Sequence, residues 1–190
     1  MFIDQTLLER VCSGAISVVG RGRQVDPPHL IMPLTVEPSK PRLCHDNFFL
    51  NLWMADRPFR LDNLSHLPRY LTTGCYQTTL DDKSGYDDIL LDLPNRMFFD
   101  IKWKGWYFVS NTIPFGWKIS AYVYHFTGLL VSHFLRSIGV PCSLYIDDRH
   151  NGELQFKNSG LSADALRVIV TNQRNRGHGR KIDFAHTLPI

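Results

Sequence analysis

Two short runs that each end in a pair of aspartates set the strongest limit on how this chain folds. They are residues 75–80, which lead into Asp81 and Asp82, and residues 141–146, which lead into Asp147 and Asp148. Runs of this length and composition are typical of strands. If the two strands are neighbours, their carboxylates lie side by side and offer the hard oxygen ligands that suit Mg²⁺. Aspartate is also common in tight turns, so either pair taken alone is open to a purely structural interpretation.

The composition indicates one globular domain, with room for a fragment of another. The chain has 190 residues, of which 44% are apolar, enough to build a core. No apolar run approaches the roughly 18 residues of a membrane-spanning helix, and residues 1–5 lack the start of a secretory signal. We therefore expect no membrane association and an intracellular location. In that setting the scattered cysteines are expected to be free thiols: Cys12, Cys44, Cys75 and Cys142.

The excess of basic charge lies in the last part of the chain. Residues 1–150 hold 15 basic and 15 acidic residues, whereas residues 151–190 hold 6 basic and 3 acidic ones. This distribution argues against a strongly basic nucleic-acid patch on the body of the protein. It leaves open a local groove of Lys and Arg beside the carboxylates.

Apolar periodicity and breakers predict alternating short strands and helices, with prolines 27, 28, 33, 38 and 41 excluding a long helix between them. Strands or extended pieces are predicted at 15–19, 29–32, 34–36, 40–46, 75–80, 97–103, 106–110 and 141–146. Residues 97–103 and 106–110 flank Lys104 and Gly105 and are predicted to form an antiparallel hairpin. Residues 149–156 are expected to complete a second hairpin with 141–146. Helices are predicted at the start of the chain before Gly14, in the second part of 59–67 after a loop, at 84–94 and at 117–138. Residues 48–54 form a helix turn or a buried segment.

The longest predicted helix carries apolar residues at spacings of three and four, and Gly139 and Pro141 end it. His125 and His133 lie on this helix, and we interpret both as structural or solvent-facing rather than as ligands.

An extended segment around Cys44 places Arg42 and Asp46 on the same side, because alternate residues of a strand share a face. A guanidinium fork matches phosphate oxygens, so Arg42 is a candidate for triphosphate binding. The alternative is a surface ion pair between Arg42 and Asp46. Neighbouring residues of a strand point to opposite faces, so we expect no metal site at residues 44–46.

Four blocks, in this order along residues 15–155, resemble the palm of a reverse transcriptase, most closely the DIRS-like or gypsy-like retrotransposon enzymes. They are Lys40–Asp46 with Leu50 and Asn51 (fingers motif), Leu80–Ile89 (first catalytic motif), Pro114–Lys118 (template and nucleotide motif) and Tyr145–Asp148 (Tyr-x-Asp-Asp box). The resemblance implies an α+β fold, a polymerase right-hand palm with partial fingers, in which an antiparallel sheet packs on helices and the thumb is absent. Residues 1–75 would be partial fingers and the entry to the palm, 76–156 the palm with the catalytic carboxylates, and 157–190 an atypical basic, poorly ordered tail.

The resemblance also implies the roles of single residues in an RNA-directed DNA polymerase that takes dNTPs and an RNA or DNA template with a primer. Asp81, Asp147 and Asp148 would hold two Mg²⁺ ions, with Mn²⁺ as a substitute. The nucleotide-binding residues would be Arg42 at the triphosphate, Asp82 through its backbone carbonyl, Tyr86 as the steric gate against a ribose 2′-hydroxyl, and Phe115 and Gly116 in the pocket wall.

The sequence departs from the family pattern in two places. Phe48 stands where the family usually has a basic residue, and residues 157–190 contain no recognisable thumb or RNase H domain. We expect that a partner chain supplies these parts or that the tail is foreign sequence reached through a frameshift or an aberrant gene model. The alternative function is a catalytically inactive retroelement remnant that binds nucleic acid weakly, and a metal-dependent nuclease ranks last.

Overall fold

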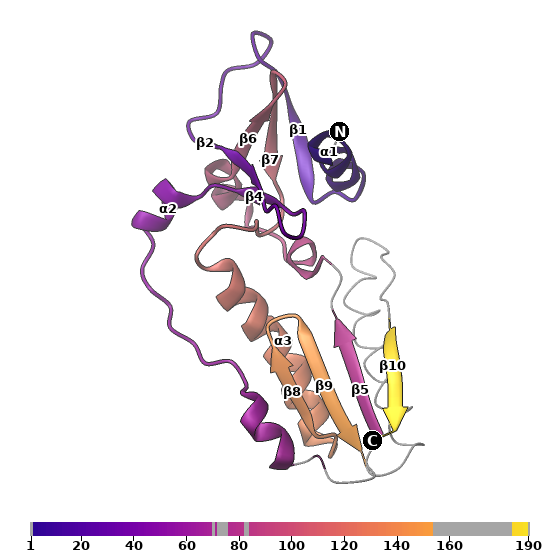
Figure 1. Cartoon of the computed structure of the whole chain (residues 1–190). Coiled ribbons are helices and arrows are strands. Elements are labelled where there is room, and N and C mark those ends of the chain that lie inside the picture. The colour runs from indigo at the N-terminus through magenta and orange to yellow at the C-terminus, as the bar shows by residue number, and fades with distance from the viewer. Residues whose placement is uncertain (1, 70, 72–75, 82–83, 154–183, 190) are drawn as a thin grey trace. The chain divides into compact units, whose positions relative to one another are not determined.

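The computed structural model describes residues 2–69, 71, 76–81, 84–153 and 184–189, which fall into two compact units (Figure 1). The first unit comprises Met1–Arg57 and Tyr86–Ser120, and the second comprises Pro58–Gly85 and Ala121–Ile190. Each unit is therefore built from two separate segments of the chain.

A four-stranded sheet with the order β1-β7-β6-β2 forms the centre of the first unit. The sheet pairs are antiparallel except for β2 and β6, which are parallel. A separate antiparallel pair joins β3 to β4. The elements of this unit are α1 (Phe2–Cys12), β1 (Ile16–Arg21), β2 (Ile31–Met32), β3 (Leu34–Val36), β4 (Leu43–His45), α2 (Phe48–Leu52), η3 (Leu93–Phe98), β6 (Asp100–Trp103) and β7 (Trp106–Ser110).

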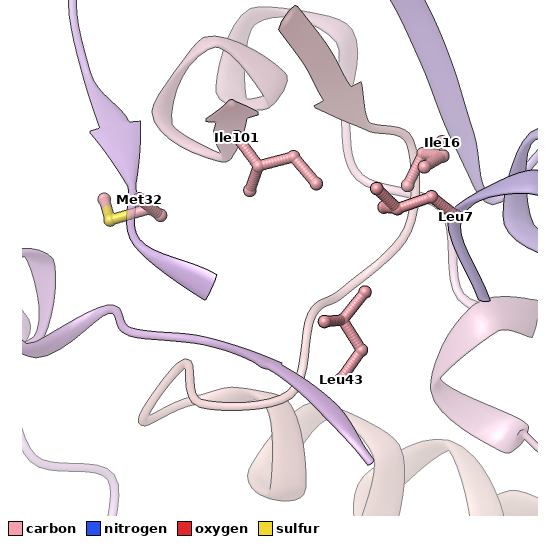
Figure 2. Close-up of a cluster of buried hydrophobic side chains, with 5 residues drawn as sticks. All are labelled: Leu7, Ile16, Met32, Leu43 and Ile101. Atoms are coloured by element: carbon pink, nitrogen blue, oxygen red, sulfur yellow. The ribbon is translucent and has the colours of Figure 1, made fainter. Parts of the chain in front are cut away.

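The core of the first unit collects one apolar side chain from each of five elements (Figure 2). Ile101 at the centre of β6 is fully buried, and the others are at most 4% exposed. The cluster consists of Leu7, Ile16, Met32, Leu43 and Ile101. It packs α1 and β4 against the sheet, and this fixes the segment that follows β4.

The predicted hairpin of residues 97–110 is confirmed as the pair β6 and β7. Its turn consists of Lys104 and Gly105, which have positive φ angles of 46° and 80°. A two-residue turn with positive φ at both positions is the type I′ turn, whose twist matches that of the flanking strands.

The second unit contains an antiparallel sheet with the order β10-β5-β9-β8 and one long helix beside it (Figure 1). Leu80, Val131, Leu135 and Cys142 join the helix to the sheet in a buried cluster. The elements are η1 (Leu64–Arg69), β5 (Tyr76–Asp81), α3 (Ser120–Ser137, beginning at the unit boundary), β8 (Cys142–Tyr145), β9 (Asp148–Glu153) and β10 (Phe184–Pro189).

The predicted long helix and its stop signal are confirmed. Gly139 has a φ of 82° and donates its N–H to Arg136 O at 3.1 Å, while Val140 N–H reaches Leu135 O at 2.9 Å. This pair of bonds is the Schellman motif, in which glycine accepts the left-handed conformation after the last turn. The chain then enters β8 directly.

The predicted helix at 84–94 is wrong, because contacts distant in sequence take its hydrogen-bonding groups. Leu91 N–H donates to Asn111 O, and Ile113 N–H donates to Ile89 O. Only two short 3₁₀ segments form, η2 (Gly85–Asp88) and η3. The helix expected to end before Pro68 likewise continues to Arg69 as the 3₁₀ segment η1.

Residues 48–54 form the helix turn that the sequence allows, and the alternative of a buried segment is wrong. No residue of α2 is buried, and Phe48 is 70% exposed.

Part of the predicted tail lies outside the described residues, including the weak helix pattern at 161–170 and the polar segment 171–181. Phe184–Pro189, expected to be poorly ordered, forms β10 and pairs with β5. Cys12, Cys44 and Cys142 are free thiols, and Cys75 lies outside the described residues. Across the described ranges, no helix is long and apolar enough to cross a membrane.

Candidate functional site

The aspartates predicted to bind metal lie on two neighbouring strands and the turn that precedes one of them. Asp81, the last residue of β5, is the register partner of Asp148, the first residue of β9. Asp148 is also the partner of Tyr145 at the end of β8. Residues directly opposed in an antiparallel pair have Cα atoms about 4.5 to 5.5 Å apart. The fold of the second unit thus brings positions 81 and 148 together, with Asp147 adjacent in the turn.

The next row of the sheet fixes this register. Leu80, Leu144 and Arg149 are register partners and at most 5% exposed. Arg149 donates from Nη2 to the carbonyl of Gly128 on α3 at 3.1 Å. Neighbouring residues of a strand point to opposite faces, so Asp148, which is exposed, lies on the face away from α3.

Gly128 allows the close approach of α3 to the sheet. A Cβ atom at this position would lie 2.8 Å from Cδ2 of Leu144. A one-residue slip of β9 would turn Arg149 away from the helix and Asp148 towards it. Packing of the buried row therefore maintains the position of the exposed aspartate.

The hairpin turn between β8 and β9 consists of Ile146 and Asp147, and Ile146 has a φ of 56°. A β-branched residue rarely adopts a positive φ, because its Cβ crowds the backbone. Such strain is concentrated at functional sites, where the surrounding structure holds it in place. Here the paired strands hold it, and Asp147 follows the strained residue directly.

The donor chemistry at this edge of the sheet suits a hard cation. Carboxylate oxygens are preferred by Mg²⁺, which also keeps water ligands and therefore suits an open face. Among the described side chains, no group of three His, Cys, Asp or Glu residues is placed to hold a metal ion. The side chain of Asp81 and the whole of Asp82 lie outside the described residues. Metal binding therefore stays a prediction from the sequence.

Asp62 is a residue of this site that the sequence analysis missed. Its Oδ2 accepts hydrogen bonds from the backbone N–H of Leu144 at 3.0 Å and from Nη2 of Arg136 at 2.9 Å. Arg136 also donates to the carbonyl of Cys142, from Nε at 3.1 Å and from Nη2 at 2.9 Å. Among the described strands, β8 lies at one edge of its sheet, and an edge strand has backbone groups that lack a neighbouring strand. Asp62 and Arg136 satisfy two of them just before the strained turn.

A second group of predicted site residues meets in the first unit. The Phe115 ring lies 4.5 Å from the Tyr86 ring, centroid to centroid, with 32° between the ring planes. The guanidinium carbon of Arg42 lies over the Phe115 ring, 5.7 Å from the centroid of that ring. Arg42, Phe115 and Tyr86 thus form one group, which we call the Arg42 stack. Asp46, the alternative partner of Arg42, accepts the Phe48 N–H through Oδ1 at 3.1 Å.

Gly116 follows the stack in a conformation and a space that only glycine fits. Its φ is 99°, and a Cβ atom would lie 2.0 Å from the carbonyl oxygen of His45. His45 N–H donates to Phe115 O at 3.0 Å, which draws the turn against β4.

Asn51 holds the same turn from the other side. Its Nδ2 donates to Gly116 O at 2.9 Å, and its Oδ1 accepts the Lys118 N–H at 2.8 Å. Asn51 belongs to a block that resembles the fingers motif, but no role follows for it from sequence alone. The position within that block is the signal that could have identified it.

His45 supports the stack as a neutral buried ring. It is 1% exposed, and burial, with a smaller contribution from the positive charge of Arg10, lowers its pKa to about 3. The ring is therefore uncharged near neutral pH. His45 is buried whereas its neighbour Asp46 is exposed, and the absence of a metal site at residues 44–46 stays a prediction from the sequence.

Comparisons with known proteins identify the fold. No protein-family model matches the sequence, and no curated protein matches it. Among solved structures, the chain is similar to the foamy viral protease-reverse transcriptase dRH in complex with double-stranded DNA. The TM-score is 0.72 at 15% sequence identity, over 96% of this chain and 30% of that one. The chain therefore has a reverse transcriptase-like fold and spans about 30% of the length of the structure it matches.

Proposed function

We propose that this chain is the RNA-directed DNA polymerase domain of a DIRS-like or gypsy-like retroelement. The observation that carries the proposal is the direct pairing of Asp81 with Asp148, beside Asp147 in a strained hairpin turn. In this proposal residues 76–156 serve as the palm and residues 1–75 as partial fingers. The reaction is the transfer of a nucleotide to the 3′-hydroxyl of a primer.

Asp81, Asp147 and Asp148 would hold the divalent ions, Mg²⁺ or in its place Mn²⁺. When bound, two such ions lower the pKa of an attacking hydroxyl and stabilise the leaving pyrophosphate. The chain's own contribution is to keep the carboxylates in place before the substrate arrives. Pairing of β5, β9 and β8 supplies that order, and the backbone carbonyl of Asp82 is proposed as a further oxygen ligand.

The Arg42 stack and Gly116 would bind the incoming dNTP. A guanidinium group matches the oxygens of a triphosphate, which assigns Arg42 to the phosphate end. Tyr86 would exclude a ribose 2′-hydroxyl by the bulk of its ring. Phe115 supports that ring by stacking on it, and Gly116 allows close packing of the backbone in the pocket wall.

The proposed partners are an RNA or DNA template with its primer, and a further chain that supplies a thumb or an RNase H domain. The similar viral enzyme was solved with double-stranded DNA, which supports a nucleic-acid duplex as the class of ligand.

Single-nucleotide addition tests the proposal. The full chain is incubated with poly-rA, an oligo-dT primer, dTTP and Mg²⁺, beside the variant Asp147→Asn and the control variant Asp56→Asn. We expect the wild type and the control to add one or a few nucleotides, with little processive synthesis, and Asp147→Asn to add none. Synthesis that persists in Asp147→Asn would exclude these carboxylates. A wild type that folds but adds nothing would support the inactive remnant instead.

A further inference from the structure

We infer that the ion pair between Arg10 and Asp87 sets the position of the Tyr86 ring and makes Arg10 a residue that determines the preference for deoxyribonucleotides. This inference rests on the proposed function, because it assigns Arg10 a role at the proposed nucleotide site. Arg10 acts through Asp87 and is a positioning residue.

The ion pair links α1 to the short segment that carries Tyr86. Nη2 of Arg10 lies 2.7 Å from Oδ1 of Asp87, and the two side chains are 10% and 9% exposed. At this depth the attraction between the charges is screened much less than on the surface. Both residues belong to the first unit, so the pair lies within one compact body.

The segment around Tyr86 has little regular structure of its own. η2 is a 3₁₀ segment of four residues, and the carbonyl of Tyr86 accepts a long hydrogen bond of 3.4 Å from Ile89 N–H. Hydrogen-bond geometry in 3₁₀ turns is poorer than in α-helices. The charged contact of Asp87 therefore contributes strongly to fixing the backbone at its neighbour Tyr86.

The position of Tyr86 affects the Arg42 stack directly, because the Tyr86 ring is one of its members. Its ring packs on Phe115 at 4.5 Å, and the Phe115 carbonyl is held by the His45 N–H at 3.0 Å. One side of the stack is thus fixed by β4 and the other by the ion pair. A displacement of about 1 Å in a positioning group can cost about 10²-fold in an enzyme reaction, so a smaller shift of the ring is enough to change selectivity.

Removing Arg10 would move Asp87 rather than leave it in place. A carboxylate that loses its cationic partner in a buried setting is costly, so the chain relaxes towards solvent or another donor. Arg10→Lys retains a point charge without the planar fork, and it should keep part of the positioning. Arg10→Met and Asp87→Asn should lose it.

Fluorine NMR of the full chain, labelled with 3-fluorotyrosine, tests the positioning directly. The Tyr86 resonance is assigned by its loss in Tyr86→Phe. We expect Arg10→Met and Asp87→Asn to shift or broaden this resonance, and Arg10→Lys to change it less. The matched controls Arg21→Met and Asp26→Asn, at exposed positions of the same unit, should leave it unchanged. An unchanged Tyr86 resonance in Arg10→Met and Asp87→Asn would overturn the inference.

Nucleotide selectivity tests the second part of the inference, that Arg10 determines the preference for deoxyribonucleotides. The rates of single addition of dTTP and of ribothymidine triphosphate are compared on poly-rA with oligo-dT. We expect Arg10→Met and Asp87→Asn to lower the preference for dTTP by about tenfold, less than the ~10²-fold of a full ångström displacement. An unchanged preference would overturn the inference and leave the proposed function standing. A wild type that adds neither nucleotide would overturn the proposed function, and the fluorine spectra would still decide whether the ion pair positions Tyr86.

Discussion

Asp81 and Asp148 are direct register partners across the antiparallel strands β5 and β9. The pairing depends on the buried row beside it, where Arg149 bonds to Gly128 on α3 and Leu144 is fully buried. Because faces alternate along a strand, the same row that anchors the sheet to the helix keeps Asp148 on the open face. The register of β5 and β9 thus determines both how the sheet packs on α3 and where the proposed metal-binding aspartates lie.

Removing Asp62 should loosen the edge of the sheet that carries the hairpin. In Asp62→Ala, Leu144 N–H and Arg136 lose their shared acceptor. Hydrogen bonds to a charged group contribute about 1.5 to 3 kcal/mol. Asp62 is 27% exposed, so we expect a loss near the lower end, about 1 to 2 kcal/mol, in urea denaturation. Asp56→Ala is the matched control, since Asp56 pairs with Lys118 but is 82% exposed. Equal stability of Asp62→Ala and the wild type would contradict this account.

Gly116→Ala should destabilise the first unit more than Gly105→Ala. Both glycines have positive φ, but an added Cβ meets the His45 carbonyl at position 116 and nothing within 4 Å at position 105. The left-handed conformation costs a non-glycine residue about 1 to 2 kcal/mol, and overpacking adds about 1 to 3 kcal/mol. We therefore expect about 3 kcal/mol for Gly116→Ala and about 1 kcal/mol for Gly105→Ala by thermal or urea denaturation. Similar losses in the two variants would show that the turn moves freely away from β4.

His45 should make the protein sensitive to acid. Its pKa is lowered to about 3 in the folded state, whereas an unfolded histidine has a pKa near 6.5. Below about pH 6.5, His45 binds a proton in the unfolded chain but not in the folded chain, so stability is lost as the pH falls. At pH 5 this amounts to about 2 kcal/mol for one residue. Urea denaturation at pH 7.5 and 5 should show a smaller drop in His45→Leu than in the wild type, and an equal drop would exclude this origin.

Asp100 should act in the opposite direction. Burial raises its pKa to about 6, so the folded state favours the protonated form and stability falls as the pH rises from about 4 to about 6. Asp100→Asn should therefore be more stable than the wild type at pH 7.5. We expect about 1 to 2 kcal/mol, less than the roughly 3 kcal/mol of the whole shift, because solvent screens part of the charge. The difference should disappear near pH 4, and a constant difference across this range would point to packing.

The opposing effects of His45 and Asp100 partly cancel in the wild type between pH 4 and 6, which makes the two single variants more informative than the wild-type profile alone.

Local signals in the sequence were enough for the elements that depend on few residues. The apolar spacing of residues 117–138 and the stop at Gly139 predicted α3, and Lys104 with Gly105 predicted the β6–β7 turn. Both depend on backbone preferences that neighbouring residues determine.

Features that depend on contacts between residues distant in sequence could not be predicted from local sequence patterns. Asp62 gains its role only because β8 is an edge strand whose Leu144 N–H faces outward. The helix predicted from Ser84 is replaced because Asn111 and Ile113 supply other hydrogen-bond partners for Leu91 and Ile89. The ion pair of Arg10 with Asp87 joins residues that only the tertiary fold brings together. The candidate aspartates and aromatic residues of the site could be predicted from the sequence, but the side chains that contact and position them could not.

Binding of Mn²⁺ to the full chain tests the central claim most directly, because Mn²⁺ reports carboxylate ligands by electron paramagnetic resonance without primer, template or turnover. Wild type, Asp147→Asn, Asp148→Asn and the control Asp56→Asn are titrated with Mn²⁺, and bound Mn²⁺ is then displaced with Mg²⁺. We predict that the wild type and the control bind Mn²⁺ equally. The affinity of the two site variants for Mn²⁺ should be lower by more than about tenfold. Loss of a residue that only supports a metal ligand already lowers metal affinity by about tenfold or more. Equal Mn²⁺ affinity in all four proteins, or none in the folded wild type, would contradict the account.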